Sequence, residues 1–248
     1  MRLTRVFVDE ALANRDRLRL TGDPANHLAR VLRLAAGDAL RLFDGRGGEY
    51  EAQIEQVDKR GVDVRLGARH AVERESPLRI TLLQGMARGE RMDLIVQKAT
   101  ELGVVAIRPL RASRSSVKLD ATQGTRKLEH WRAVAISACE QSGRNRVPEI
   151  LAPLSVAEAC ACDESGLKLM LAVDGARPLP MLLQTTDAAT RTNGISLLVG
   201  PEGGLDDAEE TAARLTGFAS TLLGPRVLRT ETAPIAALAA LQTLAGDF

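Results

Sequence analysis

The chain has very few aromatic side chains: four Phe, one Tyr and one Trp make up 2% of its 248 residues. Nucleic-acid binding through stacked bases would therefore have few platforms to use. The three cysteines, Cys139, Cys160 and Cys162, are odd in number and unevenly spaced, which argues against a disulfide framework. The cysteines and the three histidines also lack the spacing of metal ligands, so we expect no metal site.

Long apolar runs are absent as well. The longest uncharged stretch, residues 232–246, is too short and too rich in alanine to span a bilayer, so we expect no membrane association. The opening residues MRLTRVFVDEAL carry charges throughout and have no apolar core, which argues against a signal peptide. These features indicate a reduced, cytoplasmic protein.

The charges that are present are unevenly distributed. The whole chain has a net charge of +1, but residues 76–150 hold 13 Lys and Arg against 7 Asp and Glu. Residues 151–248 hold 6 basic and 12 acidic residues. The basic middle of the chain predicts a surface for a polyanion, and chance clustering on a solvated surface is the alternative.

The pattern of apolar residues changes at residues 73–78. This polar stretch contains a proline and is predicted to be a linker. Before it, a helix with Leu28, Val31 and Leu32 inward and short alternating strands predict a small β-rich unit. After it, apolar strands alternate with amphipathic helices, which is typical of a parallel α/β sheet. The first unit's helix is predicted at 22–38 and its strands at 39–43, 49–57 and 62–68. The second unit's strands are predicted at 78–85, 104–110, 167–173, 195–200 and 219–224, and its helices at 90–103, 126–143, 206–217 and 233–245.

Two polar loops follow predicted strands of the second unit: GPEGG at 200–204 and GPRVLRTET at 224–232. Ligands of open parallel sheets bind beyond the carboxyl ends of the strands, so we expect a site where these loops follow adjacent strand ends. Tight structural turns are the alternative for the glycines, but five hydrogen-bonding side chains at 226–232 exceed what a turn needs. The chain has no dinucleotide-binding, P-loop or nucleophile-elbow motif.

These loops, together with QKATELGV, CEQSGRNRVPEI and HLARVLR, resemble the bacterial 16S ribosomal RNA uridine N3-methyltransferases, which belong to the SPOUT class. The resemblance implies a PUA-like RNA-binding β-barrel at residues 1–72. It implies a SPOUT-type α/β domain with a parallel sheet at 73–248, with a C-terminal trefoil knot at about 195–248 that binds S-adenosylmethionine. It further implies a homodimer, and as substrate the 16S rRNA of an assembled small ribosomal subunit, methylated at N3 of a uridine in its decoding region.

The resemblance also implies roles for individual residues. Arg229 would stabilise negative charge on the uracil oxygens, and Glu231 or Glu202 would take the N3 proton. One departure from the family pattern is Pro234, which suits the first turn of a helix. The expected cofactor-binding residues are Leu198, Val199, Gly200, Pro201, Glu202, Gly203, Leu222, Leu223, Gly224, Arg226, Val227, Leu228, Thr230, Thr232 and Ala233.

RNA contacts are expected from the resemblance and from the basic middle of the chain. The motif SGRNR is also compatible with an ordinary helix end capped by Gly143. Two other functions stay open: a non-catalytic RNA-binding or ribosome-assembly factor on the same fold, and a SPOUT methyltransferase acting on another RNA. The expected RNA-binding residues are Arg2, Arg5, Arg30, Arg33, Arg88, Arg91, Arg114, Gln141, Arg144, Asn145 and Arg146.

Overall fold

The computed structural model of the chain describes residues 3–117, 121–172 and 176–248, which fall into two compact units. Unit 1 comprises Met1–Glu75 together with Cys139–Val147, and unit 2 comprises Ser76–Ala138 and Pro148–Phe248. The segment 139–147 therefore packs with the N-terminal unit, although unit 2 precedes and follows it in the sequence.

Unit 1 contains a five-stranded sheet in the order β1-β3-β4-β5-β2 among the described residues. β1 and β3 pair in parallel, and the other neighbours are antiparallel. The predicted strands at 39–43 and 49–57 are confirmed to the residue, because their alternating pattern matches a half-buried sheet. The strands are β1 (Thr4–Phe7), β2 (Arg17–Leu20), β3 (Ala39–Phe43), β4 (Glu49–Val57) and β5 (Val62–His70).

The predicted helix at 22–38 is wrong in length and in type. Helix α1 (Gly22–Asn26) is short and continues as a π-helical turn, η1 (His27–Val31). A π turn holds more residues per turn than an α-helix, so the side chains lose the 3.6-residue spacing that the prediction assumed. Leu28 is fully buried, but Val31 is 67% and Leu32 39% exposed, so only the first of the three predicted core positions is confirmed.

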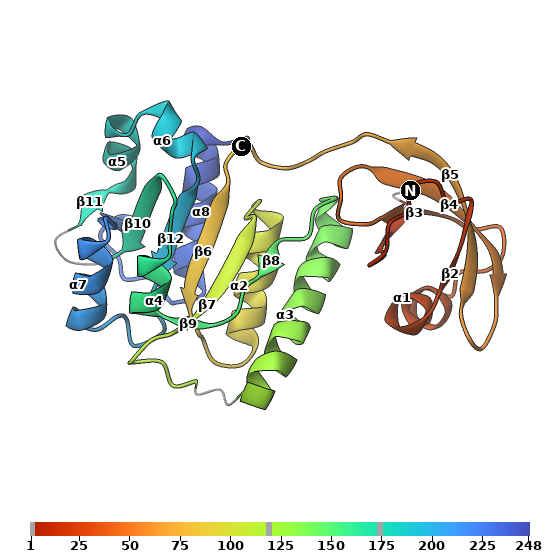
Figure 1. Cartoon of the computed structure of the whole chain (residues 1–248), viewed down its shortest axis with the longest axis horizontal. Helices are drawn as coiled ribbons and strands as arrows, with labels where there is room; N and C mark the ends of the chain where they lie inside the picture. The colour runs from red at the N-terminus through yellow and green to blue at the C-terminus, as the bar shows by residue number, and fades with distance from the viewer. Residues whose placement is uncertain (1–2, 118–120, 173–175) are drawn as a thin grey trace. The chain divides into compact units, whose positions relative to one another are not determined.

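Unit 2 is built on a sheet in which every described strand pair is parallel, which confirms the α/β prediction. The strand order is β11-β13-β10-β12-β6-β7-β8, with β9 also paired to β7 (Figure 1). The strands are β6 (Ile80–Gly85), β7 (Ala106–Arg111), β8 (Glu149–Ile150), β9 (Leu154–Ser155), β10 (Leu167–Leu171), β11 (Arg177–Pro178), β12 (Ile195–Val199) and β13 (Ala219–Leu222).

Helices cover both faces of this sheet (Figure 1). Leu83, Met170 and Leu198 form a core with residues of α4 and α7 on one face. Successive side chains of a strand point to opposite faces, so Leu82 and Leu197 project toward the other face, where α2 and α8 pack together. The helices are α2 (Glu90–Glu101), α3 (Ala121–Ser142), α4 (Val156–Ala161), α5 (Leu179–Thr185), α6 (Ala188–Thr192), α7 (Asp207–Leu215) and α8 (Thr232–Ala245).

Local sequence signals explain where the last two helices begin. Asp206 and Glu209 form a reciprocal capping box at the start of α7. Pro234 lies in the first turn of α8, where its missing N–H leaves no helical hydrogen bond unmade. Within the described ranges, no helix is long and apolar enough to cross a membrane.

Candidate functional site

Two polar loops lie beyond the carboxyl ends of parallel strands in unit 2: residues 200–206 follow β12, and residues 223–231 follow β13. Strand β10 lies between β12 and β13, so the prediction that the two loops follow adjacent strands is wrong. The loops meet nonetheless, because the second one reaches back past β10. The Thr230 hydroxyl donates a hydrogen bond to the Gly200 carbonyl at 2.9 Å.

The GPEGG loop is packed too closely for larger residues at several points. A Cβ atom on Gly85, the last residue of β6, would lie 2.4 Å from the Pro201 nitrogen. A Cβ on Gly203 would lie 2.9 Å from the Cβ of Arg114, which belongs to the loop after β7. Glycine is therefore required where the loops after β6, β7 and β12 converge, because a side chain there would displace the neighbouring loop.

A buried glutamine connects these loops. The Gln84 amide nitrogen donates to the Gly85 carbonyl at 2.9 Å and lies 3.4 Å from both the Gly200 carbonyl and the Thr230 hydroxyl. Its side chain is fully buried, and its Oε1 has no hydrogen-bond partner among the described residues. The three acceptors fix the amide orientation and leave Oε1 as the side-chain atom without a partner among the described residues.

Sequence reasoning missed Gln84. The available signal was its position: a lone amide at the end of the apolar run ITLLQG, beside a glycine and at the carboxyl end of a predicted strand. A polar side chain buried there needs partners, and only neighbouring loops could supply them.

The two predicted catalytic carboxylates, Glu202 and Glu231, share one arginine. Arg91 Nη1 lies 3.0 Å from Glu202 Oε1, and Arg91 Nε lies 3.9 Å from Glu231 Oε1. The Arg88 N–H also donates to Glu202 at 3.0 Å. Burial raises the pKa of Glu202, but these hydrogen bonds and the charge of Arg91 outweigh it, so the pKa of Glu202 is lowered on balance.

Arg229 differs from these residues because its guanidinium has no ion-pair or hydrogen-bond partner within the described part of the chain. The side chain is exposed, while its carbonyl accepts hydrogen bonds from the N–H groups of Thr232 and Ala233 at 2.9 Å. The backbone of Arg229 is thus fixed at the start of α8, and its charged group is available to a ligand.

The remaining predicted cofactor-binding residues differ in how exposed their side chains are. The side chains of Leu198 and Val199 are buried, so only their backbone could contact a ligand. In the second loop, Leu222, Leu223, Leu228 and Ala233 are partly buried, and Gly224, Arg226, Val227 and Thr232 are exposed.

Three predicted RNA-binding arginines of unit 2 lie around the GPEGG loop. Arg88 Nε donates to Ser116, Arg91 contacts Glu202, and Arg114 Nη1 donates to the Leu205 carbonyl at 2.9 Å. Among the described residues, no group of three or more His, Cys, Asp or Glu side chains could hold a metal ion. The site therefore combines a glycine backbone, two carboxylates and several arginines.

Three other predicted RNA contacts are buried inside unit 1, which corrects the expectation for them. Arg144 is 3% and Asn145 0% exposed. Arg144 Nε lies 3.2 Å from Glu75, and the Asn145 amide donates to the Val72 carbonyl at 2.6 Å. Arg5 is 8% exposed and donates to Glu49 and to Asn145. These side chains hold segment 139–147 in place and do not present their polar groups to an RNA.

The other predicted RNA contacts of unit 1 are on the surface. Gln141, Arg30 and Arg33 are exposed, and Arg146 is exposed beside Glu73 at 3.5 Å. Arg2 lies outside the described residues.

Comparisons with known proteins cover almost the whole chain. Residues 74–242 match the family profile of an RNA methyltransferase domain, and residues 20–67 match that of an RNA methyltransferase PUA domain. The ribosomal RNA small subunit methyltransferase E of Bacillus subtilis is 33% identical over 92% of this chain and 92% of its own length. The protein of that name from Synechocystis is 34% identical over 91% of this chain and 72% of its own length.

Solved structures agree with these matches. A ribosomal RNA small subunit methyltransferase E from Neisseria gonorrhoeae, bound to S-adenosylmethionine, is 37% identical with a TM-score of 0.90. A putative methyltransferase from Legionella pneumophila, also with bound S-adenosylmethionine, is 38% identical with a TM-score of 0.94. Both alignments cover 100% of each chain.

Proposed function

The chain belongs to the RNA methyltransferase family, in its ribosomal RNA small subunit methyltransferase E group, and we propose that it methylates N3 of a uridine in the decoding region of 16S rRNA, using S-adenosylmethionine. The observation that carries the proposal is the hydrogen-bonded junction of Gln84, Gly200 and Thr230. It brings two polar loops, which follow strands that are not neighbours in the sheet, to one edge of the sheet, beside two carboxylates and the exposed Arg229.

The residues of this edge fit the proposed cofactor. The exposed Gly203 has no side chain to shield its backbone N–H and carbonyl groups, which suits the polar edge of a nucleoside. The unpartnered Oε1 of Gln84 is an acceptor for a bound N–H donor. When bound, S-adenosylmethionine supplies an electrophilic methyl group on a sulfonium centre.

Residues of the chain would stabilise the negative charge that develops on the uracil ring. N3 of uracil carries a proton that has to leave, and the resulting negative charge spreads to the ring oxygens. We assign Arg229 to stabilise that charge, because its guanidinium is exposed at a fixed backbone position and has no partner among the described residues. Positioning the ring against the cofactor supplies the rest of the acceleration.

Glu231 is the better candidate for the proton acceptor. Glu202 is held by the Arg88 N–H and by Arg91, and its lowered pKa makes it a weak base. Glu231 lies directly beside Arg229 and Thr230, and its contact with Arg91 is longer, at 3.9 Å. We assign Glu202 the role of holding the loops after β6 and β12 together.

The finer organisation also belongs to the proposal. Residues 1–72 would be the PUA-like barrel and 73–248 the SPOUT domain, apart from segment 139–147, which packs with the N-terminal unit. The reach of the loop after β13 past β10 to the end of β6 supports a trefoil knot at about 195–248. The remaining cofactor contacts would be the backbone of Leu198 and Val199 and the residues of the 222–233 segment.

A homodimer is proposed as the working form in the cytoplasm, where the small subunit is found. Its support in this chain is a set of exposed apolar side chains on packed helices of unit 2: Met181 on α5 is 55% exposed, and Leu244 on α8 is 50% exposed. Arg30, Arg33, Arg88, Arg91, Arg114, Gln141 and Arg146 remain the proposed RNA contacts on exposed or partly exposed surface.

Methyl transfer from labelled S-adenosylmethionine to small ribosomal subunits that lack the modification tests this function. We expect label in the small-subunit RNA and none in large subunits. Saturable cofactor binding without transfer would mean a different RNA, and absence of both would leave a non-catalytic RNA-binding factor as the better account.

A further inference from the structure

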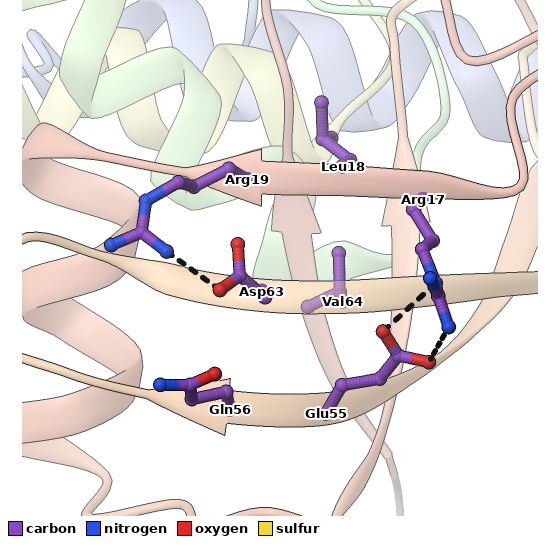
Figure 2. Close-up of a pocket in the computed structure, with 7 residues that line it drawn as sticks. All are labelled: Arg17, Leu18, Arg19, Glu55, Gln56, Asp63 and Val64. Atoms are coloured by element: carbon purple, nitrogen blue, oxygen red, sulfur yellow. Dashed lines mark hydrogen bonds and ion pairs between the residues drawn. The ribbon is translucent and has the colours of Figure 1, made fainter.

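Two hollows open on the surface of unit 1, and their charges differ. The first lies along β2, β5 and β4, where each arginine faces an acid (Figure 2). Arg17 Nε is 3.1 Å from Glu55, and Arg19 Nη1 is 2.6 Å from Asp63. The positive charges of this first hollow are compensated, so it offers little to an anion.

The second hollow, of about 480 Å³, lies between the β4–β5 turn and the helical segment of α1 and η1. We name it the turn hollow. Three of its lining residues are basic: Arg30 from η1, and Lys59 and Arg60 from the turn. All three are exposed, and within the described residues none of their side chains has an ion-pair or hydrogen-bond partner.

Among the described residues that line the turn hollow, the acidic one is Asp58, and its carboxylate already has hydrogen-bond partners. Arg19 Nη2 lies 2.8 Å from both oxygens of Asp58, and the N–H groups of Arg60 and Gly61 donate to Asp58 at 2.7 and 3.0 Å. The Arg19 hydrogen bond, followed by that of Arg60, lowers the pKa of Asp58. Asp58 therefore stabilises the turn and is not available to neutralise the three basic side chains.

Small residues keep the turn hollow open. Gly22, Ala25, Ala29 and Gly61 contribute to its wall. Gly61 cannot be larger without moving the chain, because a Cβ atom there would lie 2.4 Å from the Leu20 carbonyl oxygen. An opening of this size, lined by small residues and rimmed by uncompensated positive charge, suits the sugar-phosphate backbone of a nucleic acid.

We propose that the turn hollow binds the phosphodiester backbone of the RNA substrate, with Arg30, Lys59 and Arg60 each neutralising a phosphate. The inference rests on the proposed function, which supplies an RNA partner. Contacts of this kind position the protein along the RNA without reading its bases. Lys59 and Arg60 extend the predicted set of RNA-binding residues to a turn that no motif in the sequence singled out.

The experiment measures binding of the full-length protein to purified small ribosomal subunits as a function of salt concentration. The variant K59A/R60A removes two proposed phosphate contacts. The matched control R17A/R65A removes the same charge from the same unit, at two exposed arginines that pair with Glu55. Circular dichroism confirms that both variants are folded.

Each lost phosphate contact reduces the magnitude of the negative slope of log K against log salt by about 0.7–0.9, so K59A/R60A should reduce that magnitude by about 1.5. The control should change the slope by less than half of that. An unchanged slope for K59A/R60A, or equal changes in both variants, would overturn the inference. Wild-type protein that fails to bind small subunits at all would instead count against the proposed function.

Discussion

The guanidinium of Arg5 donates a hydrogen bond to the side-chain oxygen of Asn145 at 2.7 Å, across 140 positions of sequence. Asn145 in turn donates to the Val72 carbonyl, and Arg5 also donates to the Arg144 carbonyl at 2.8 Å. All the groups are buried or partly buried within unit 1. Arg144 and Asn145 of the SGRNR motif therefore have a structural role: their polar groups join segment 139–147 to the N-terminal part of unit 1.

Replacing Asn145 by alanine should destabilise unit 1. The change leaves a donor of Arg5 and the carbonyl of Val72 without partners in a buried setting, which costs about 2 kcal/mol of unfolding free energy. Hydrogen exchange of the amides in β1 and β5 measures the loss. The exposed neighbour Gln141 is the control, and its alanine variant should stay within about 0.5 kcal/mol of wild type. Equal protection in the two variants would contradict the structural role.

The hydrogen bonds that the Thr230 hydroxyl makes with Gln84 and with the Gly200 carbonyl should support cofactor binding. Thr230→Val removes the hydroxyl at nearly constant volume and should weaken S-adenosylmethionine binding roughly three- to tenfold, since a net hydrogen bond contributes about 0.5–1.5 kcal/mol. Thr230→Ser keeps the hydroxyl and should restore most of the affinity. Isothermal titration calorimetry provides the measurement.

A double-mutant cycle with Gln84→Leu separates this coupling from simple loss of packing. We expect the two changes together to weaken binding by less than the product of their separate effects. Gln97→Leu, at an exposed position of α2, serves as the control for the glutamine change. Strictly multiplicative effects would show that the two side chains act independently.

Some elements of the fold were predictable from the sequence, because they depend on residues that are close together in the chain. Strands β3 and β4 have complete alternating patterns bounded by glycine-rich turns, and the capping box of Asp206 and Glu209 marks the start of α7. These features depend on residues within a few positions of each other. The expectation for residues 22–38 failed because a π turn, followed by Arg33 at φ +55°, is not visible in an apolar pattern.

The buried partners of the site were not predictable in the same way. Nothing near Gln84 in the sequence indicates that it meets Thr230, 146 positions later. Burial of Arg144 likewise depends on Glu75, 69 positions earlier. Both residues are polar and sit beside glycine, so their sequence context is equally compatible with an exposed ligand-binding role and with an internal one.

Glu202 should make the stability of the protein depend on pH. Its pKa in the folded state is lowered from 4.5, so its ionised form stabilises the fold above that value. The contribution is lost as the pH falls through the folded-state pKa. The melting temperature of Glu202→Gln should therefore lie below that of wild type at pH 7, and the difference should shrink below about pH 4.5. A gap between wild type and Glu202→Gln that stays constant from pH 7 to below pH 4.5 would refute the stabilising role of ionised Glu202.

Arg229 should affect turnover more than binding of the cofactor. Removing a group that stabilises charge in the transition state typically costs about 100-fold in rate, and we expect this for Arg229→Ala. The dissociation constant for S-adenosylmethionine should change little, and Arg229→Lys should recover part of the rate. Arg214→Ala, an exposed arginine paired with Glu210 on α7, controls for loss of charge. Single-turnover methyl transfer is the assay, and a fully active Arg229→Ala protein would remove Arg229 from the mechanism.

The central claim is tested most directly by identifying the methylated nucleoside. Small ribosomal subunits lacking the modification are incubated with the protein and S-adenosylmethionine, and their RNA is digested and examined by nucleoside mass spectrometry. We predict one equivalent of 3-methyluridine in the 16S rRNA, from a fragment of the decoding region. A different methylated nucleoside, or 3-methyluridine spread over many positions, would contradict the proposed reaction and its specificity.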